Sequence, residues 1–210
     1  MPGATSGRTI VLARHGEATW TGHRFAGGTD IPLTDNGRAG AAALAASIAA
    51  SRLLDNRRAV VVCSPLIRAF ETARMIAAAI DRPLRVDPRW REVGFGMLEG
   101  LDYDAARERW PALVDRLSAG EIAIDWPGGE SWALLQERTA AAWADAVALD
   151  APLVIVSHGV AIRAALAASG VAPAPSSGQI AAVRPAGALV LREADGGWWL
   201  DGVGIPEVTS

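Results

Sequence analysis

Three apolar stretches of this chain each run into side chains that can handle a phosphoryl group. They are residues 10–13, followed by Arg14 and His15, residues 59–63, followed by Arg68, and residues 153–157, followed by His158. A neutral imidazole has a lone pair that can attack phosphorus near pH 7. A guanidinium binds phosphate oxygens two at a time, and an imidazole N–H can donate to an equatorial oxygen. The pattern predicts phosphoryl transfer to His15, with His158 and both arginines holding the phosphate.

Each of these residues alone also fits a role without chemistry. Arg68 could pair with Glu71 on its own helix, and His158 could be an ordinary residue at a helix N-terminus. The catalytic interpretation therefore depends on the residues meeting at one place.

Cleavage of a phosphate ester also needs an acid for the leaving oxygen. The segment over residues 90–100 offers two carboxyl groups, Glu92 and Glu99. Glu92 lies among aromatic and glycine residues, where desolvation would favour the protonated carboxyl. We therefore expect Glu92 to be the general acid and Glu99 to be structural.

The elements that would position these residues alternate between strand and helix. Predicted strands cover 9–13, 59–63, 84–86 and 153–157, and predicted helices cover 35–51, 65–80, 130–149 and 159–169. Thr34 and Ser64 are the expected N-caps of the first two helices, with Pro65 at the first helical position of the second. Later strands are expected near 179–183, 188–194 and 198–202, with Gly196 and Gly197 in a hairpin turn.

This order predicts an α/β fold, a three-layer α/β/α sandwich with a mostly parallel sheet and antiparallel edge strands. In such sheets ligands lie beyond the carboxyl ends of the strands, where helix N-termini also favour an anion. The periodicity weakens over residues 87–128. We expect this stretch to be a cap or substrate-side insertion within a single domain spanning residues 1–210.

Composition argues against several classes of function. The net charge of −3 gives no indication of a nucleic-acid or membrane partner, and no apolar run is long enough for a transmembrane helix. Every basic residue is arginine, which excludes a Schiff-base lysine and the Gly-Lys-Ser/Thr phosphate loop. The single cysteine, Cys63, excludes an internal disulfide and is expected in the core. With no apolar leader over residues 1–8, a cytoplasmic protein is expected.

Six motifs, in order, resemble those of the small branch of the histidine phosphatase superfamily, which has a phosphoglycerate-mutase-like fold. The family's Arg-His-Gly-Glu is matched by residues 14–17, its Gly-x-x-Asp-x-Pro-Leu-Thr-x-x-Gly by 27–37, its Ser-x-Leu-x-Arg-Ala-x-x-Thr-Ala by 64–73, its Arg-Glu-x-x-Phe-Gly-x-x-Glu-Gly by 91–100, its Pro-Gly-Gly-Glu-Ser by 127–131 and its Ser/Thr-His-Gly by 157–159.

The resemblance implies that His15 becomes phosphohistidine and that Glu92 protonates the leaving oxygen and then activates water. It implies neither a metal nor a cofactor. The residues that it places at the phosphate or the substrate are Arg14, Thr21, Gly27, Arg68, His158 and Gly159.

Two positions depart from the family's pattern. Ala18 stands where the family usually has Thr or Ser, and Thr21 stands where an Asn often follows a tryptophan. Thr21 keeps a hydroxyl, with shorter reach and fewer donors than an amide. We expect a working phosphate pocket with a slightly altered polar lining.

The predicted function is that of a metal-independent phosphomonoester hydrolase. Its expected partner is a small-molecule phosphate ester, such as α-ribazole 5′-phosphate or a sugar or glycerate phosphate. The alternatives are a cofactor-dependent phosphoglycerate mutase and a non-catalytic phospho-ligand binder. Absence of lysine and a short cap favour the phosphatase, because the resembling mutases are longer and use a lysine. The sequence leaves a dimer open.

Overall fold

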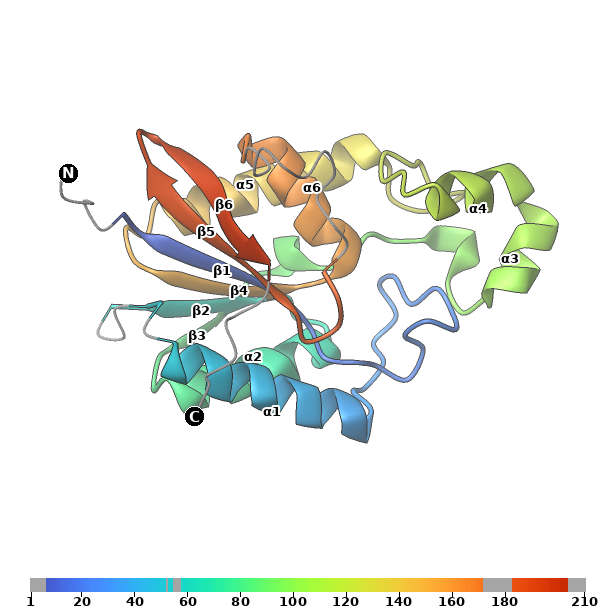
Figure 1. Cartoon of the computed structure of the whole chain (residues 1–210). Helices are drawn as coiled ribbons and strands as arrows, with labels where there is room; N and C mark the ends of the chain where they lie inside the picture. The colour runs from blue at the N-terminus through green and yellow to red at the C-terminus, as the bar shows by residue number, and fades with distance from the viewer. Residues whose placement is uncertain (1–6, 52, 55–57, 172–182, 204–210) are drawn as a thin grey trace.

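A six-stranded sheet forms the centre of the computed structural model, which describes residues 7–51, 53–54, 58–171 and 183–203. Its strand order is β3-β2-β4-β1-β5-β6 (Figure 1). The strands are β1 (Thr9–Arg14), β2 (Val60–Cys63), β3 (Leu84–Val86), β4 (Leu153–Ser157), β5 (Ala188–Ala194) and β6 (Gly197–Val203). The first four are parallel, and β5 and β6 add antiparallel pairs at one edge. The predicted sheet is confirmed.

Two pairs of helices cover the two faces of this sheet. Helices α1 (Asp35–Ala50) and α2 (Ile67–Ala79) lie on one face, and α5 (Trp132–Val147) and α6 (Gly159–Ser169) lie on the other (Figure 1). The predicted three-layer sandwich is therefore confirmed. Among the described residues, no helix has the length and apolar character that spanning a bilayer would require.

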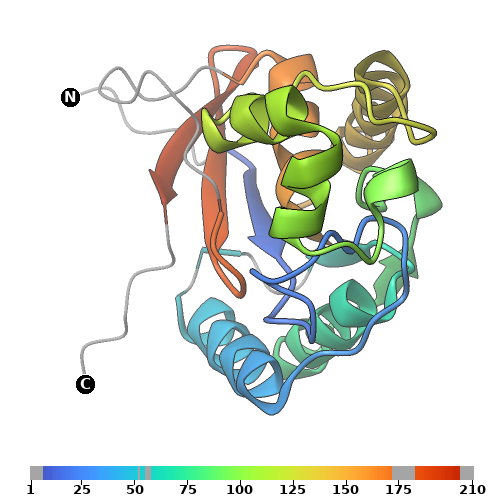
Figure 2. The same ribbon diagram turned by 90° about the vertical axis from the view of Figure 1, so that its right-hand side faces the viewer.

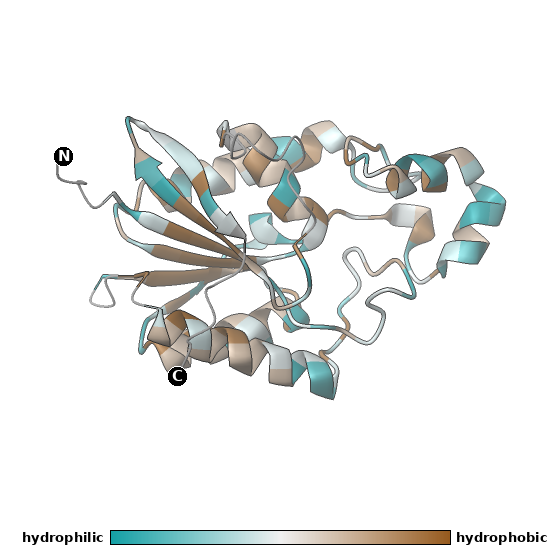
Figure 3. Cartoon of the chain, in the orientation of Figure 1, coloured by the Kyte–Doolittle hydropathy of each residue, from teal (hydrophilic) through white to brown (hydrophobic). Residues whose placement is uncertain are grey.

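The alternating side chains of β4 show why its sequence is apolar throughout. Leu153 and Ile155 pack into the core cluster under α5 and α6, whereas Val154 and Val156 pack into the cluster against α1 and α2. All four side chains are fully buried, and each contributes about 1.5–3 kcal/mol by leaving water. The central strands accordingly form the most hydrophobic part of the molecule (Figure 3).

Cys63, at the end of β2, belongs to the core as expected. It is fully buried in the cluster against α1 and α2. Burial raises the pKa of its thiol to about 12, so it stays a neutral packing residue at ordinary pH.

A set of short helices lies beyond the carboxyl ends of the parallel strands. They are η1 (Pro88–Trp90), η2 (Gly96–Leu98), α3 (Tyr103–Arg109) and α4 (Pro111–Ser118). A third apolar cluster joins this region to α5 and α6 through Leu135, Ala161 and Ala164. Figure 2 shows α3, α4 and the loop between β1 and α1 in front of the strand ends.

Some predicted helix boundaries were wrong. Helix α2 begins at Ile67 with Leu66 as N-cap, because the Ser64 hydroxyl accepts the Leu66 N–H in a preceding turn instead of capping the helix. Helix α5 is two residues shorter at each end than expected, since Ser131 is its N-cap and its side chain accepts the Leu134 N–H.

The C-terminal hairpin also differs from the prediction. Asp195 and Gly196 form its turn, with φ of 50° and 77°, the left-handed pair that suits a tight hairpin. Gly197 is already the first residue of β6. Of the strand expected near 179–183, only Val183 lies within the described residues, and it is not in a strand.

Candidate active site

The two histidines meet because the strands before them are neighbours. Arg14 of β1 pairs in parallel register with Ser157 of β4, so the residues that follow leave the sheet side by side. The backbone N–H of His15 donates to the Ser157 carbonyl at 3.0 Å, and the rings of His15 and His158 have centroids 4.9 Å apart. The predicted meeting of strand ends therefore occurs.

The His15 imidazole is held as a neutral ring with one defined tautomer. Its Nδ1 lies 2.6 Å from the Gly16 carbonyl oxygen, and because that oxygen can only accept, Nδ1 carries the hydrogen and Nε2 keeps its lone pair. Burial holds the His15 pKa well below its ordinary value, and the charges of Arg68 and Arg14 lower it further against the opposing Gly16 hydrogen bond. The His15 imidazole is therefore neutral at neutral pH, with a free lone pair on Nε2.

Gly16 allows the loop after β1 to close over α1. A Cβ on Gly16 would overlap the Gly37 carbonyl oxygen, and a Cβ on Gly37 would overlap the Glu17 carbonyl oxygen. The Gly16 N–H also donates to the Thr72 hydroxyl of α2 at 3.1 Å. The backbone beside His15 is thus fixed to both helices of one face.

His158 is fully buried and has one ring nitrogen without a partner among the described residues. Its Nε2 lies 2.8 Å from the Ser64 Oγ at the end of β2, and its Nδ1 is the unpartnered atom. Burial holds the His158 pKa well below its ordinary value, and the neighbouring His15 ring and the charges of Arg68, Arg14 and Arg138 lower it further. When the Ser64 hydroxyl donates to Nε2, the hydrogen lies on Nδ1, ready for an anion.

Both arginines are anchored by backbone carbonyls, and neither forms an ion pair within the described part of the chain. Arg68, only 1% exposed, donates to the carbonyls of Thr29 and Gly27, both at 2.8 Å. Arg14 donates to the Val183 carbonyl at 3.0 Å, and its buried Nε has no partner among these residues. Burial lowers both pKa values, opposed by the Glu92 charge, yet a guanidinium remains charged. Two guanidiniums without an ion-pair partner in the described part of the chain thus lie near His15.

Glu92 is half-buried, but its surroundings differ from those expected. Its carboxylate accepts the N–H groups of Val93 at 3.0 Å, Ala161 at 3.0 Å and Val160 at 3.2 Å. The last two belong to the first turn of α6, where the helix dipole also favours a negative charge. The aromatic and glycine neighbours in the sequence are therefore not what holds this carboxylate: backbone donors and a helix N-terminus do.

A cavity of about 410 Å³ opens over these residues. Its lining includes seven of the residues selected from the sequence: Arg14, His15, Thr21, Gly27, Arg68, Glu92 and Gly159. His158 does not line this cavity and is fully buried against Ser64. The Thr21 hydroxyl accepts the Ala18 N–H at 2.9 Å, which leaves its own hydrogen free to donate.

Glu99, outside this set, has the structural role expected of it. Glu99 accepts the N–H groups of Gly28 and Phe95, both at 3.0 Å, and the Thr29 hydroxyl at 2.9 Å. It therefore fixes the loop that carries the Arg68 acceptors. His23 is exposed and does not line the cavity.

Arg163 is a cavity residue that was not predicted from the sequence. It lies one turn after Gly159 on α6, lines the cavity and donates to the Gly120 carbonyl at 2.8 Å, while its buried Nε has no partner among the described residues. Burial lowers its pKa. The four-residue spacing from Gly159 was the available signal, since it places both residues on one helix face.

The comparisons with known proteins agree on one protein family. The model for the histidine phosphatase superfamily (branch 1) matches residues 10–206. A probable phosphoglycerate mutase GpmB of Enterobacter sp. is 37% identical over 161 residues, covering 73% of this chain and 70% of the relative. Phosphoglycerate mutase-like protein 4 of Arabidopsis thaliana is 31% identical over 195 residues, covering 90% and 81%.

Solved structures with the same fold include a phosphatase. A mycobacterial glucosyl-3-phosphoglycerate phosphatase superposes with a TM-score of 0.77 at 29% identity, covering 96% of this chain and all of that one. The Bacillus stearothermophilus protein YhfR superposes with a TM-score of 0.78 at 27% identity, covering 92% and 95%.

Proposed function

The chain belongs to branch 1 of the histidine phosphatase superfamily, and from that membership we propose that it is a metal-independent phosphomonoester hydrolase acting through a phosphohistidine at His15. The observation that carries the proposal is the state of His15. It is a neutral imidazole with a free Nε2 lone pair, and it borders a cavity together with two guanidiniums that lack a carboxylate partner among the described residues. An incoming phosphate dianion supplies the missing negative charge.

In the first step the phosphate ester binds to Arg14 and Arg68 in the cavity, and its phosphoryl group comes within reach of the Nδ1–H of the buried His158 as it approaches the neighbouring His15 ring. The His15 Nε2 attacks phosphorus as the bond from phosphorus to the ester oxygen breaks, and Glu92 gives a proton to that oxygen. The leaving alcohol departs and His15 carries the phosphoryl group.

In the second step a water molecule takes the place of the leaving alcohol. Glu92, now ionised, accepts a proton from the water molecule while the oxygen of that water attacks phosphorus. The phosphorus–nitrogen bond breaks, inorganic phosphate forms and His15 returns to its neutral state. The N–H groups of α6 that hold the Glu92 carboxylate support this second role.

The cavity lining supports a small phosphorylated metabolite as substrate. Beyond the phosphate ligands, Phe25, Tyr103 and Leu117 offer apolar contact, and Arg24 and Arg163 offer positive charge. A sugar or glycerate phosphate has carbon atoms that can contact the apolar side chains and oxygen atoms that can accept from the arginines. The similarity to the mycobacterial glucosyl-3-phosphoglycerate phosphatase favours the same class.

A phosphoglycerate mutase is the second candidate. The names of curated relatives favour it, and the guanidiniums of Arg24 and Arg163 could hold a second phosphate. The absence of lysine weighs against it, because the mutases of this family use one for that purpose.

One set of assays separates these functions. A chromogenic aryl phosphate and a panel of sugar and glycerate phosphates are incubated in chelator at mildly acidic pH, with His15→Ala and the exposed-site control His23→Ala alongside. The phosphatase proposal predicts phosphate release that His15→Ala abolishes and His23→Ala retains. Interconversion of 2- and 3-phosphoglycerate that depends on a bisphosphate primer supports the mutase. Phosphate-competitive binding without turnover indicates a non-catalytic binder.

A further inference from the structure

The segment that carries Glu92 has no regular structure of its own. Glu92 lies between η1 and η2, in a stretch that is neither helix nor strand. The Glu92 carboxylate is held by α6, as described above, but those contacts do not fix the backbone on either side of the residue. A side chain of α5 does so.

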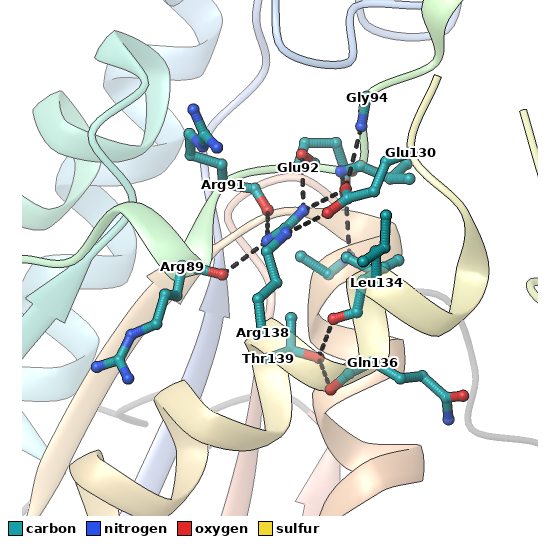
Figure 4. Close-up of polar contacts among 12 residues, drawn as sticks. Arg89, Arg91, Glu92, Gly94, Glu130, Leu134, Gln136, Arg138 and Thr139 are labelled. Atoms are coloured by element: carbon teal, nitrogen blue, oxygen red, sulfur yellow. Dashed lines mark hydrogen bonds and ion pairs between the residues drawn. The ribbon is translucent and has the colours of Figure 1, made fainter. Parts of the chain in front are cut away.

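That side chain is Arg138, and its guanidinium reaches three successive points on the segment. Its Nη1 donates to the carbonyls of Arg89 at 2.6 Å and Arg91 at 2.8 Å, and its Nη2 donates to the carbonyl of Glu92 itself at 3.1 Å (Figure 4). These contacts span the chain immediately before and at the acid. Arg138 therefore fixes the position of the Glu92 backbone directly.

Glu130 orients the guanidinium from the opposite side. Its two carboxylate oxygens accept from Nε and Nη2 of Arg138 at 2.6 Å and 2.7 Å (Figure 4). Both side chains are largely buried, with 17% and 19% of their surface exposed. The backbone N–H of Glu130 also donates to the Gly94 carbonyl at 2.9 Å. The pair thus holds the segment on both sides of Glu92.

The count of donors explains why this position suits arginine. A guanidinium has five N–H groups in a fixed plane, and the five contacts of Arg138 account for all of them. A lysine ammonium has three N–H groups and could not satisfy three carbonyls and both carboxylate oxygens. No donor remains for a substrate, so Arg138 acts only through what it holds.

We propose that Arg138 and Glu130 are positioning residues that set the place of the Glu92 carboxyl, and with it the efficiency of proton transfer to the leaving group. The proposal rests on the proposed function, in which Glu92 is the general acid. General acids act over hydrogen-bond distances, and misplacing a reacting group by 1 Å can cost about 10²-fold in rate.

The test exploits the leaving group. The alkoxide of an alkyl phosphate, such as a glycerol phosphate, is a poor leaving group that needs a proton. The phenolate of 2,4-dinitrophenyl phosphate leaves readily without one. The ratio of kcat/KM for the two esters therefore measures how much proton donation by the general acid contributes to the rate. A change in the phosphate pocket, including loss of the Arg138 charge near His158, lowers both values together and leaves the ratio unchanged.

Glu92→Gln calibrates the assay, and Arg138→Met and Glu130→Gln test the proposal. The matched control is Arg8→Met. Arg8 makes a similar two-bond ion pair with Glu193, at 2.8 Å and 2.7 Å, and donates to the Val147 carbonyl at 2.7 Å. It is comparably buried, with 22% of its side chain exposed, but it lies outside the cavity lining.

We expect Glu92→Gln to lower kcat/KM for the alkyl ester by about 10²-fold or more relative to the aryl ester. Arg138→Met should shift the ratio in the same direction by about tenfold or more, Glu130→Gln less, and Arg138→Lys should lie between Arg138→Met and the wild type. Arg8→Met should leave the ratio unchanged. If Arg138→Met does not fold, Arg138→Lys and Glu130→Gln decide by the same ratio.

The possible failures are distinguishable. An unchanged ratio in Glu92→Gln removes the acid from the proposed function and overturns the inference with it. A shifted ratio in Glu92→Gln, together with Arg138 and Glu130 variants that behave like Arg8→Met, overturns the inference alone.

Discussion

Two of the three histidines of this chain should make its stability depend on pH. His15 and His158 are buried with pKa values held well below the ordinary one, whereas in the unfolded chain an imidazole titrates near pH ~6.5. Below that pH the unfolded state binds protons that the folded state does not. The free energy of unfolding therefore falls as the pH is lowered from about 6.5.

The expected size follows from the same linkage. Between about pH 7.5 and about pH 5.5, each imidazole that stays neutral in the folded state contributes a loss of about 1.4 kcal/mol, and the pair a loss of about 2.7 kcal/mol. Carboxyl groups with ordinary pKa values titrate mainly below this window. The histidines should therefore dominate the change.

Urea unfolding in phosphate-free buffer measures this dependence. The wild type is compared with His15→Asn, His158→Asn and His23→Asn, the last replacing the exposed histidine. Each buried variant should lose about half of the pH dependence, whatever its absolute stability. Wild-type stability that stays constant over the window, or equal slopes in all variants, would refute the assignment of neutral buried imidazoles.

Two further predictions concern the phosphate pocket and its loop. Arg68→Lys should weaken binding of inorganic phosphate by about tenfold or more in calorimetric titration, because an ammonium cannot hold two carbonyls and bind phosphate in two places; the exposed Arg74→Lys on α2 should bind as the wild type does. Gly27→Ala should destabilise the protein by more than Gly22→Ala in thermal unfolding. Both glycines have positive φ, but a Cβ at Gly27 would overlap the Glu99 carboxylate and one at Gly22 would meet nothing within 4 Å. Equal losses would contradict this account of the loop.

The sequence predicted the meeting of His15, Arg68 and His158 because parallel strands end at one edge. Each residue follows an apolar run that predicts a parallel strand. The ends of parallel strands meet at one edge of the sheet, so these residues were expected together without knowledge of the side-chain packing. The polar surroundings of Glu92 could not be predicted in the same way. Its donors include backbone N–H groups of α6, near residue 160. Residue types do not show which side chain a backbone N–H group will meet.

Ser64 and Arg138 show two other limits of the sequence. Serine before a proline is typical of a helix N-cap, so Ser64 was assigned that role and its contact with His158 was not predicted. The structure shows Leu66 as the N-cap and Ser64 in contact with His158. Arg138 is one of 20 arginines, and nothing local distinguishes it from those on the surface. Only the three-dimensional path of the chain places its guanidinium against the carbonyls around Glu92.

The most direct test of the central claim is to trap the phosphoryl group. Glu92→Gln should accept phosphate from 2,4-dinitrophenyl phosphate, which needs no acid, and then stall because water is not activated. The protein is quenched at alkaline pH, where phosphohistidine survives, digested and measured by mass spectrometry, with His15→Ala alongside. The account predicts one added HPO₃ group on His15 and none in His15→Ala. Turnover without an adduct on His15, or an adduct on His158 instead, would contradict it.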